Sequence, residues 1–271
     1  FFAAHGDLLE EVAKFRAARR IWARVMKERF DAKDKRSLLL RFHTQTGGST
    51  LTAQQPENNI VRTTIEALAA VFGGTQSLHT NAYDEALALP TEKSARVALR
   101  TQQIIAYESG VTNSVDPLAG SYVVEYLTDE LEKRVVALLD EIDRRGGAVA
   151  GVESGYFKEA IARSAYEYQK AVEAGEQTVV GVNKFAEEDA DVPEILKLDP
   201  ALESKQIDAL NRLRKERNQA AVDEALRRLR SAAEAGENIV PEVLNAVEAY
   251  ATVGEISDAF REIWGEYRET N

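Results

Sequence analysis

The feature that most constrains the fold is a strand–helix–strand pattern in residues 37–80. The apolar segment SLLLRF, residues 37–42, predicts a buried strand, and TQSLHT, residues 75–80, predicts a second one. The segment between them has helical apolar spacing, with Pro56 at its start and two glycines at its end. Strand, helix and strand in this order predict a parallel α/β unit.

Most of the remaining sequence predicts helices, because its apolar residues recur every three or four positions. The expected helices are residues 7–30, 91–107, 121–145, 155–174 and, at the end, about 254–268. From about residue 201 the chain is charged and helical in pattern, whereas TVVGVNKF, residues 178–185, predicts a short strand. The chain therefore combines an α/β part of two or three strands, to about residue 90, with a mainly helical remainder.

Two or three parallel strands are too few to close a barrel, and they leave an exposed edge unless other strands complete the sheet. The sequence also begins FFAAHG, without a methionine. We therefore expect the chain to be a fragment of a longer protein, with the missing strands supplied from elsewhere.

Charge and composition exclude several classes of function. The net charge of −11 and the pI of about 5.0 disfavour nucleic acid or an anionic membrane surface as a partner. The absence of cysteine excludes a disulfide framework, a thiolate metal site and a cysteine nucleophile. No apolar run approaches the roughly 20 residues of a membrane span, and the first residues do not form a signal peptide. We expect a cytoplasmic protein.

Polar and small residues follow both predicted strands. His43, Gln45 and the pair Gly47-Gly48 follow the first strand, and His79 and Asn81 end the second. In parallel α/β folds ligands bind at the carboxyl ends of the strands. Glycines there allow a flat or bulky ligand to approach the backbone, and amides can orient a ligand without titrating.

Each of these residues also has a structural interpretation. The two glycines can form a simple turn, and each histidine can be a hydrogen-bonded structural residue. Asp84 and Glu85 can occupy the first turn of a helix, where the helix dipole favours acidic side chains. The histidines show no metal-binding spacing, and neither a G-x-S-x-G elbow nor a phosphate loop occurs. Conventional hydrolysis is therefore unsupported.

The block from RFHTQTGGST to EALALPT, residues 41–91, closely resembles the coenzyme B12-dependent acyl-CoA mutases. Within them it most resembles the large subunit of methylmalonyl-CoA mutase. The resemblance continues through EEVAKFRAARRIWARVM, ESGVTNSVDPLAGSYVVEYLTDEL, VVGVNKF and ATVGEISDAFREIWGEY. It covers in effect the entire chain.

The resemblance implies an α/β fold, the C-terminal part of a (β/α)8 TIM barrel followed by a mainly helical segment. Residues 1–110 would be the last strands and helices of the barrel, and residues 111–271 the helical C-terminal segment. The family's active-site histidine and most acyl-CoA contacts would lie upstream of Phe1, so the catalytic residues are unknown. No metal ligand is expected either, because the family's cobalt-binding D-x-H-x-x-G motif fits none of the three histidines. The cobalamin-binding domain is thus expected to be absent from this chain.

The resemblance implies adenosylcobalamin as the cofactor and five residues that contact it. Gln45 matches a residue that contacts the cofactor, and Gly48 matches a position where the corrin ring lies against the backbone. Asn81 and Glu85 match residues that hold the adenosyl group, with Glu85 accepting from the ribose hydroxyls. Ala88 matches a further close contact.

The implied activity is that of an isomerase, a radical 1,2-rearrangement of an acyl-CoA carbon skeleton. Interconversion of methylmalonyl-CoA and succinyl-CoA is the first expectation. The isobutyryl-CoA and 2-hydroxyisobutyryl-CoA mutases are alternatives, because FFAAHGDLLEE resembles their large subunits and QTGGST departs from the QTSGW of many methylmalonyl-CoA mutases. A non-catalytic scaffold subunit also remains open. The implied partners are the acyl-CoA substrate, the rest of the large-subunit barrel and a separate cobalamin-binding small subunit or domain, in an oligomer.

Overall fold

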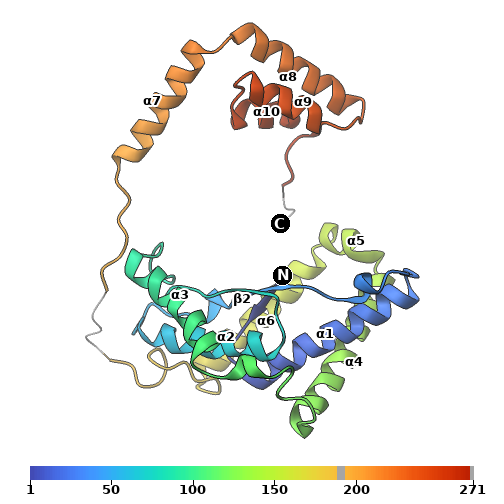
Figure 1. Cartoon of the computed structure of the whole chain (residues 1–271), viewed down its shortest axis with the longest axis vertical. Helices are drawn as coiled ribbons and strands as arrows, with labels where there is room; N and C mark the ends of the chain where they lie inside the picture. The colour runs from blue at the N-terminus through green and yellow to red at the C-terminus, as the bar shows by residue number, and fades with distance from the viewer. Residues whose placement is uncertain (188–192, 269–271) are drawn as a thin grey trace. The chain divides into compact units, whose positions relative to one another are not determined.

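The computed structural model describes residues 1–187 and 193–268, and the chain divides into two compact units, Phe1–Leu196 and Lys197–Asn271 (Figure 1). The first unit contains β1 (Phe2–Ala4), α1 (Leu8–Glu28), η1 (Lys35–Leu38), β2 (His43–Thr46), η2 (Gly48–Thr50), α2 (Asn58–Phe72), β3 (Ser77–His79), α3 (Glu92–Tyr107), η3 (Val111–Asn113), α4 (Tyr122–Arg144), α5 (Gly147–Glu153) and α6 (Tyr156–Glu173). The second contains α7 (Ala201–Glu216), α8 (Gln219–Glu234), α9 (Val240–Glu248) and α10 (Val253–Trp264). No helix in the described part of the chain is both long and apolar enough to cross a membrane.

The strands form one parallel sheet in the order β1-β2-β3. Its register pairs Ala3 of β1 with Gln45 of β2, and Gln45 with His79 of β3. The parallel α/β unit predicted from the sequence is therefore confirmed. Strand β1 was not predicted, because three residues are too few to display a strand period.

The first strand predicted from the sequence, at residues 37–42, is wrong. Residues 35–38 form the 3₁₀ turn η1 instead, because the Asp34 side chain accepts a hydrogen bond from the backbone N–H of Arg36 (2.8 Å) and caps that turn. Leu39 is 60% exposed, so the leucine run is not a buried strand. The strand begins at His43, where buried Thr44 and exposed Gln45 show the alternation of a sheet with one covered face.

The strand predicted at residues 178–185 is also wrong. A turn occupies this segment, in which the Gly181 N–H donates to the Lys184 carbonyl (2.8 Å) and only an isolated bridge joins Val180 to Lys184. Gly181 has a positive φ of 81°, which suits a turn and interrupts a strand.

The predicted helices are present, several with the expected ends. The segment NNIVRTTIEALAAVF is α2, and its C-cap Gly73 donates to the Ala69 carbonyl (2.8 Å). Glycine is required there, because a Cβ atom on Gly73 would lie 2.2 Å from Cδ2 of Phe15 in α1. Thr91 caps α3 as expected by accepting from the Ser94 N–H (3.2 Å). The final helix ends earlier than predicted, at Trp264, because Gly265 follows with a φ of 71°.

Helices α1 and α2 cover one face of the sheet. The core on that face consists of buried Ala4, Phe15, Phe42 and Ala70, with Phe2, Leu40 and Leu78 packed against them. Phe15 stacks on Phe42 with the ring centroids 5.2 Å apart. This aromatic contact fixes α1 behind strands β1 and β2.

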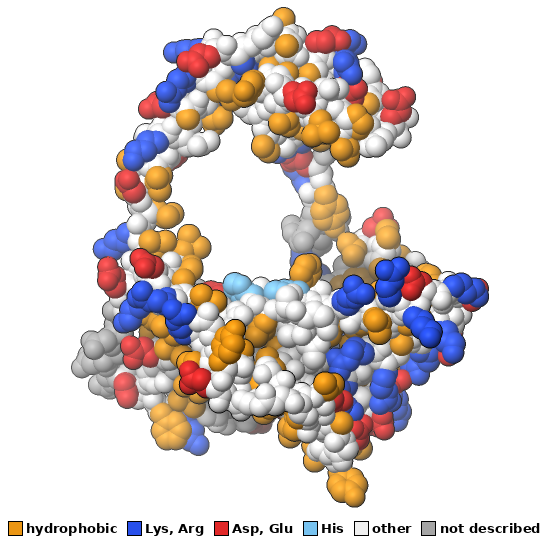
Figure 2. Space-filling model, viewed as in Figure 1, with side chains coloured by type: hydrophobic (Ala, Val, Ile, Leu, Met, Phe, Trp, Pro, Cys, Tyr) orange, Lys and Arg blue, Asp and Glu red, His pale blue; other side chains and the backbone are white. Residues whose placement is uncertain are grey.

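The opposite face of the sheet is polar and accessible. By strand alternation and register it carries Ala3, His43, Gln45, Ser77 and His79, of which only His43 is partly buried. Histidine side chains are visible on the molecular surface in Figure 2. Parallel sheets are ordinarily covered on both faces. Within the described residues, this sheet thus lacks the layer that would cover its second face.

A row of ion pairs joins α1 and the residue after it, Arg29, to α4 and the loop before it. The pairs are Arg16 with Asp116 and with Glu125 (2.6 Å), Arg20 with Asp129 (2.8 Å) and Glu132 (2.5 Å), Arg24 with Glu132 (2.8 Å), and Arg29 with Asp143 (2.8 Å). Single exposed pairs contribute little, but a connected row of arginines sets the register of the two helices. Helix α4 is thereby attached to the unit that carries the sheet.

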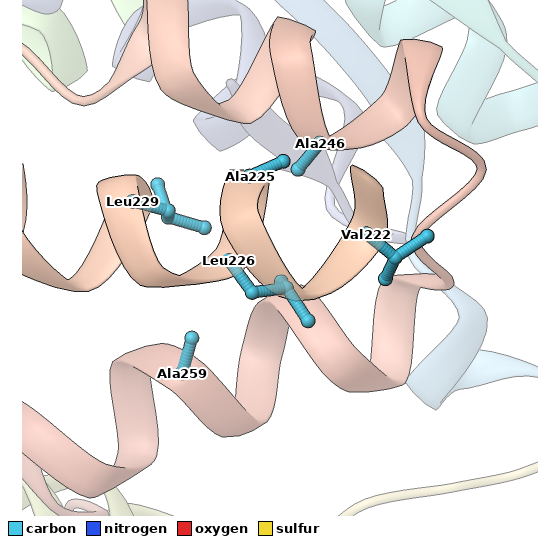
Figure 3. Close-up of a cluster of buried hydrophobic side chains, with 6 residues drawn as sticks. All are labelled: Val222, Ala225, Leu226, Leu229, Ala246 and Ala259. Atoms are coloured by element: carbon cyan, nitrogen blue, oxygen red, sulfur yellow. The ribbon is translucent and has the colours of Figure 1, made fainter. Parts of the chain in front are cut away.

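In the second unit, α9 and α10 pack against α8 around a small apolar core (Figure 3). The buried residues are Val222, Ala225, Leu226, Leu229, Ala246 and Ala259. An ion pair supports this core: the guanidinium of Arg217, whose side chain is 2% exposed, donates to both oxygens of Glu255 (2.7 and 2.6 Å). Glu255 also accepts from the N–H of Thr252 (2.8 Å) and completes a capping box at the start of α10.

We expect α10 to lose stability in acid. The hydrogen bonds from Arg217 lower the pKa of Glu255 from about 4.5 to about 2. Because the folded-state pKa is depressed, this stabilisation is complete above pH 4.5 and is lost as the pH falls towards 2. At pH 7, Glu255→Gln should destabilise this unit by about 2 kcal/mol. Amide hydrogen exchange of α10 in the full chain measures the loss.

The matched control is Glu248→Gln, an exposed glutamate at the end of α9. Its α10 should exchange as in the wild type at each pH from 7 to 3, with the same loss of protection in acid. Equal sensitivity of the two variants would contradict the role of the Arg217–Glu255 pair.

Candidate ligand-binding edge of the sheet

The carboxyl ends of the three strands bring three loops to one edge of the sheet. His5 follows β1, the pair Gly47-Gly48 follows β2, and the segment from Thr80 to Ala88 follows β3. The Gly47 N–H donates to the carbonyl of Ala4 (2.8 Å), which ties the second loop to the end of β1. A Cβ atom on Gly47 would lie 2.3 Å from Cδ2 of His5, so the imidazole ring lies directly against this glycine.

Asn81 is the polar centre of this edge. It is 2% exposed, and its backbone N–H donates to the hydroxyl of Thr46 (2.9 Å), which in turn donates to the Asn81 side-chain oxygen (2.9 Å). The amide of Gln45 donates to the same oxygen (3.4 Å). The Asn81 amide nitrogen donates to Oε1 of Glu85 (2.8 Å). A buried amide thus fixes two accessible groups, the Gln45 amide and the Glu85 carboxylate.

Gly48 lies against the same polar groups. A Cβ atom at this position would be 2.6 Å from Oε1 of Glu85 and 2.9 Å from Nδ2 of Asn81. The missing side chain therefore allows the Asn81–Glu85 pair to approach the backbone of the turn.

Glu66 of α2 holds the Gly47–Thr50 turn by contacts from its side chain. It is 0% exposed, its Oε2 accepts from the Gly47 N–H (3.0 Å), and its Oε1 lies 2.6 Å from the Thr50 hydroxyl oxygen. Burial raises the pKa of Glu66 to about 7, and the hydrogen bonds from Thr50 and Gly47 oppose only part of that rise. The turn that carries Gly48 is thus attached to α2.

The structure brings together four of the five residues expected to contact a cofactor. Gln45, Gly48, Asn81 and Glu85 form the cluster described above. Ala88 lies one turn further along, half-buried, with its N–H donating to the Asp84 carbonyl (3.0 Å), and no described contact joins it to the other four.

The structural interpretation of His43 is confirmed: its Nδ1 is hydrogen-bonded to the Ser77 hydroxyl (2.8 Å), which links β2 to β3. The interpretation of Asp84 and Glu85 as first-turn residues of a helix is wrong, because both lie in turns before α3, which begins at Glu92. Asp84 is fully buried and accepts from the N–H of Thr91, the N-cap of α3 (3.2 Å).

Two residues of this edge were missed by sequence reasoning. His5 follows a strand too short to be recognised from the sequence. Glu66 has the spacing of the buried face of α2, one turn from buried Thr63 and Ala70, and that position was the available signal.

Parallel α/β proteins commonly bind ligands at the carboxyl ends of their strands, where this unit has an accessible polar edge. A family model described as methylmalonyl-CoA mutase matches residues 1–266. The chain therefore belongs to the methylmalonyl-CoA mutase family, the B12-dependent acyl-CoA mutases, as the sequence resemblance predicted.

Individual relatives cover nearly all of the chain. It is 49% identical over its whole length to the 2-hydroxyisobutanoyl-CoA mutase large subunit of Aquincola tertiaricarbonis, covering 48% of that protein. It is 46% identical to the probable mitochondrial methylmalonyl-CoA mutase of Caenorhabditis elegans (100% of this chain, 37% of that one). It is also 46% identical to the methylmalonyl-CoA mutase of Escherichia coli K12 (98% and 37%). The chain thus spans half or less of the length of these relatives.

Proposed function

We propose that this chain is part of an adenosylcobalamin-dependent acyl-CoA mutase, an isomerase that rearranges an acyl carbon skeleton. In this proposal residues 1–110 are the last strands and helices of a (β/α)8 barrel. Residues 111–271 are the helical segment that follows the barrel at the C-terminus of the large subunit. The observation that carries the proposal is the accessible polar face of a parallel sheet, with a cluster of amides and one carboxylate at its carboxyl edge. In a closed barrel that face becomes the interior, where substrate and cofactor meet.

The residues at the edge fit the proposed cofactor. The backbone at Gly48 carries no side chain, and half-buried Gly48 offers a surface against which a flat ring can lie. The exposed carboxylate of Glu85, oriented by Asn81, is suited to accept hydrogen bonds from ribose hydroxyls. The amide of Gln45 supplies a neutral donor beside them. The role of Ala88 rests on the family resemblance alone.

Bound adenosylcobalamin would supply the carbon radical that starts the 1,2-rearrangement. The residues of this chain contribute binding and orientation. Asn81 and Glu85 would hold the adenosyl group, Gln45 would contact the cofactor beside them, and the buried Thr46 hydroxyl keeps Asn81 in position. A barrel that closes over the polar face would exclude water from the reacting atoms.

Gly48→Ala should weaken binding of adenosylcobalamin by about tenfold, which corresponds to about 1.4 kcal/mol. The added Cβ would displace the Glu85 carboxylate and break its contact with Asn81. Equilibrium binding to the assembled protein measures the effect. Gly6→Ala is the control, because no atom lies within 4 Å of a Cβ at Gly6. Equal affinities of the two variants would contradict the placement of the cofactor at Gly48.

The acyl group is proposed from the relatives. Methylmalonyl-CoA is one candidate, because its mutases are 46% identical to this chain. The 2-hydroxyisobutyryl-CoA alternative is supported by the 49% identity to a large subunit that acts on that substrate, and isobutyryl-CoA is the third candidate. The test offers each thioester separately to the full-length protein with its cobalamin-binding partner. Formation of succinyl-, 3-hydroxybutyryl- or butyryl-CoA identifies the substrate, and no turnover with bound cofactor would favour the scaffold alternative.

The proposed partners are the rest of the barrel, which supplies the missing strands, and a cobalamin-binding small subunit or domain. The large-subunit relative supports a two-subunit assembly. Among the described residues no strand pairs with the outer edges of β1 and β3, which supports the need for further strands, because natural proteins protect exposed sheet edges.

A further inference from the structure

Glu66 is a buried carboxyl group for which the proposed chemistry has no use, yet it contacts the turn on which the proposed cofactor site depends. Both of its oxygens are directed to that turn, one towards the Gly47 N–H (3.0 Å) and one towards the Thr50 hydroxyl (2.6 Å). The next residue after Gly47 is Gly48, the backbone position beside Asn81 and Glu85. Any movement of the turn therefore moves the surface offered to the ligand.

The hydrogen bonds of Thr50 determine the protonation state in which this arrangement is complete. The Thr50 hydroxyl oxygen lies 2.7 Å from the Gly47 carbonyl and 2.6 Å from Oε1 of Glu66. A hydroxyl has one hydrogen to donate, so it cannot donate to both. Both contacts are hydrogen bonds when Thr50 donates to the Gly47 carbonyl and a protonated Glu66 donates to Thr50. If Glu66 ionises, the Thr50 hydrogen turns to the carboxylate, and the Gly47 carbonyl loses the hydroxyl and keeps only the backbone N–H of Thr50 (3.0 Å).

We propose that Glu66, in its protonated form, is a positioning residue that holds the Gly47-Gly48 turn in the conformation that receives the cofactor. This inference rests on the proposed cofactor site, which it deepens. Glu66 acts through the backbone of the turn and contacts no reacting atom.

The charged and titratable groups around Glu66 are consistent with a neutral carboxyl. The negative charge of Glu11 in α1 raises the pKa of Glu66. The positive charge of Arg62 in α2 lowers it, but by less than any of the other neighbours changes it. Glu11 is itself paired with Lys14. On the other side of the turn, His5 lies against Gly47. Burial is the largest effect and places the pKa of Glu66 at about 7.

The test measures adenosylcobalamin affinity of the assembled full-length protein from pH 6 to pH 8.5. The wild type should bind about tenfold more weakly at the upper end, since the turn loses one hydrogen bond when Glu66 ionises. Glu66→Gln should bind equally well at every pH, because its amide oxygen can accept from Gly47 and its NH₂ group can donate to Thr50. Glu66→Met, which has neither group, should bind about tenfold more weakly than wild type at pH 6.

His5→Gln is the control, because histidines titrate in the same pH range. This variant should keep the pH dependence of the wild type. If Glu66→Gln retains the pH dependence, or if Glu66→Met binds as well as wild type, Glu66 does not position the turn. The comparison of wild type with Glu66→Gln decides the question even if the methionine variant does not fold.

A second readout separates this inference from the proposed function. Exchange of the Thr50 amide, which closes the turn by donating to the Gly47 carbonyl (3.0 Å), should slow below pH 7 in cofactor-free wild type, after correction for intrinsic rates, and show no such change in Glu66→Gln. If the wild type binds no adenosylcobalamin at any pH, the proposed function fails, and Thr50 exchange still shows whether Glu66 holds the turn. Identical exchange in the two proteins overturns the inference whatever the cofactor result.

Discussion

Replacing Glu85 by alanine should weaken the binding of adenosylcobalamin to the assembled protein by about 30-fold. The Glu85 carboxylate is exposed, oriented by the Asn81 amide at 2.8 Å, and lies beside Gly48 at the end of β2. Hydrogen bonds to a charged group contribute about 2 kcal/mol, which corresponds to this change in affinity. The fold should be unaffected, because an exposed side chain contributes little to the core. Equilibrium binding and a thermal melt together measure both results.

The control for this variant is Glu108→Ala, which removes an exposed carboxylate at the end of α3. Its affinity should equal that of the wild type. Unchanged affinity and turnover in Glu85→Ala would remove Glu85 from the site, and with it the assignment of the adenosyl group to this edge.

The largest effect on stability is expected from Phe15→Ala, at about 4 kcal/mol. Phe15 is 0% exposed, stacks on Phe42 and contacts the edge of the Phe2 ring, with centroids 5.2 and 5.8 Å apart. Alanine would leave a cavity between α1 and the strands β1 and β2. The surrounding helix and strands are packed too tightly to move in and fill it. Amide exchange of β2 in the full-length protein reports the change as a loss of protection.

The comparison variant is Phe30→Ala, just beyond the end of the same helix, where the ring is 62% exposed. It should change the stability by less than about 0.5 kcal/mol. If Phe15→Ala were as mild as Phe30→Ala, the aromatic contact would not be what holds α1 behind the sheet.

The sequence predicts the helices of this chain better than its strands. Helix α2 was found because its apolar spacing is regular and Gly73 ends it, although it begins at Asn58, two residues after Pro56, where the start was expected. Strand β2 was placed too early because three consecutive leucines are a stronger signal than the polar HTQT. The leucines instead lie in and after the turn η1, which Asp34 caps through a hydrogen bond from its side chain. Apolar periodicity does not reveal such a local hydrogen bond.

The site could be predicted only in part from the residues themselves. Polar strand ends and paired glycines indicated the right edge of the sheet, and the family resemblance selected Gln45, Gly48, Asn81 and Glu85. The structure adds the contacts among them, such as the use of one Asn81 oxygen by both Gln45 and Thr46. Such contacts join positions about 35 residues apart along the chain, so no local pattern could contain them.

Glu66 illustrates the limit of pattern analysis. A glutamate within an alanine-rich helix predicts a solvent-exposed position, because ionised carboxylates are rarely buried. Here it lies on the face of α2 that packs under the Gly47–Thr50 turn, where two polar groups need a partner. A buried carboxyl is favourable here because the turn packs against α2 and provides hydrogen-bond partners for both carboxyl oxygens.

The central claim is that the carboxyl edge of β1, β2 and β3 holds adenosylcobalamin. The most direct test is an experimental structure of the full-length protein, assembled with its cobalamin-binding partner and bound to the cofactor. The account predicts the corrin ring against the backbone of Gly48 and the ribose hydroxyls within hydrogen-bond distance of Glu85. A cofactor bound away from this edge, with Gln45, Asn81 and Glu85 free of contact, would contradict it.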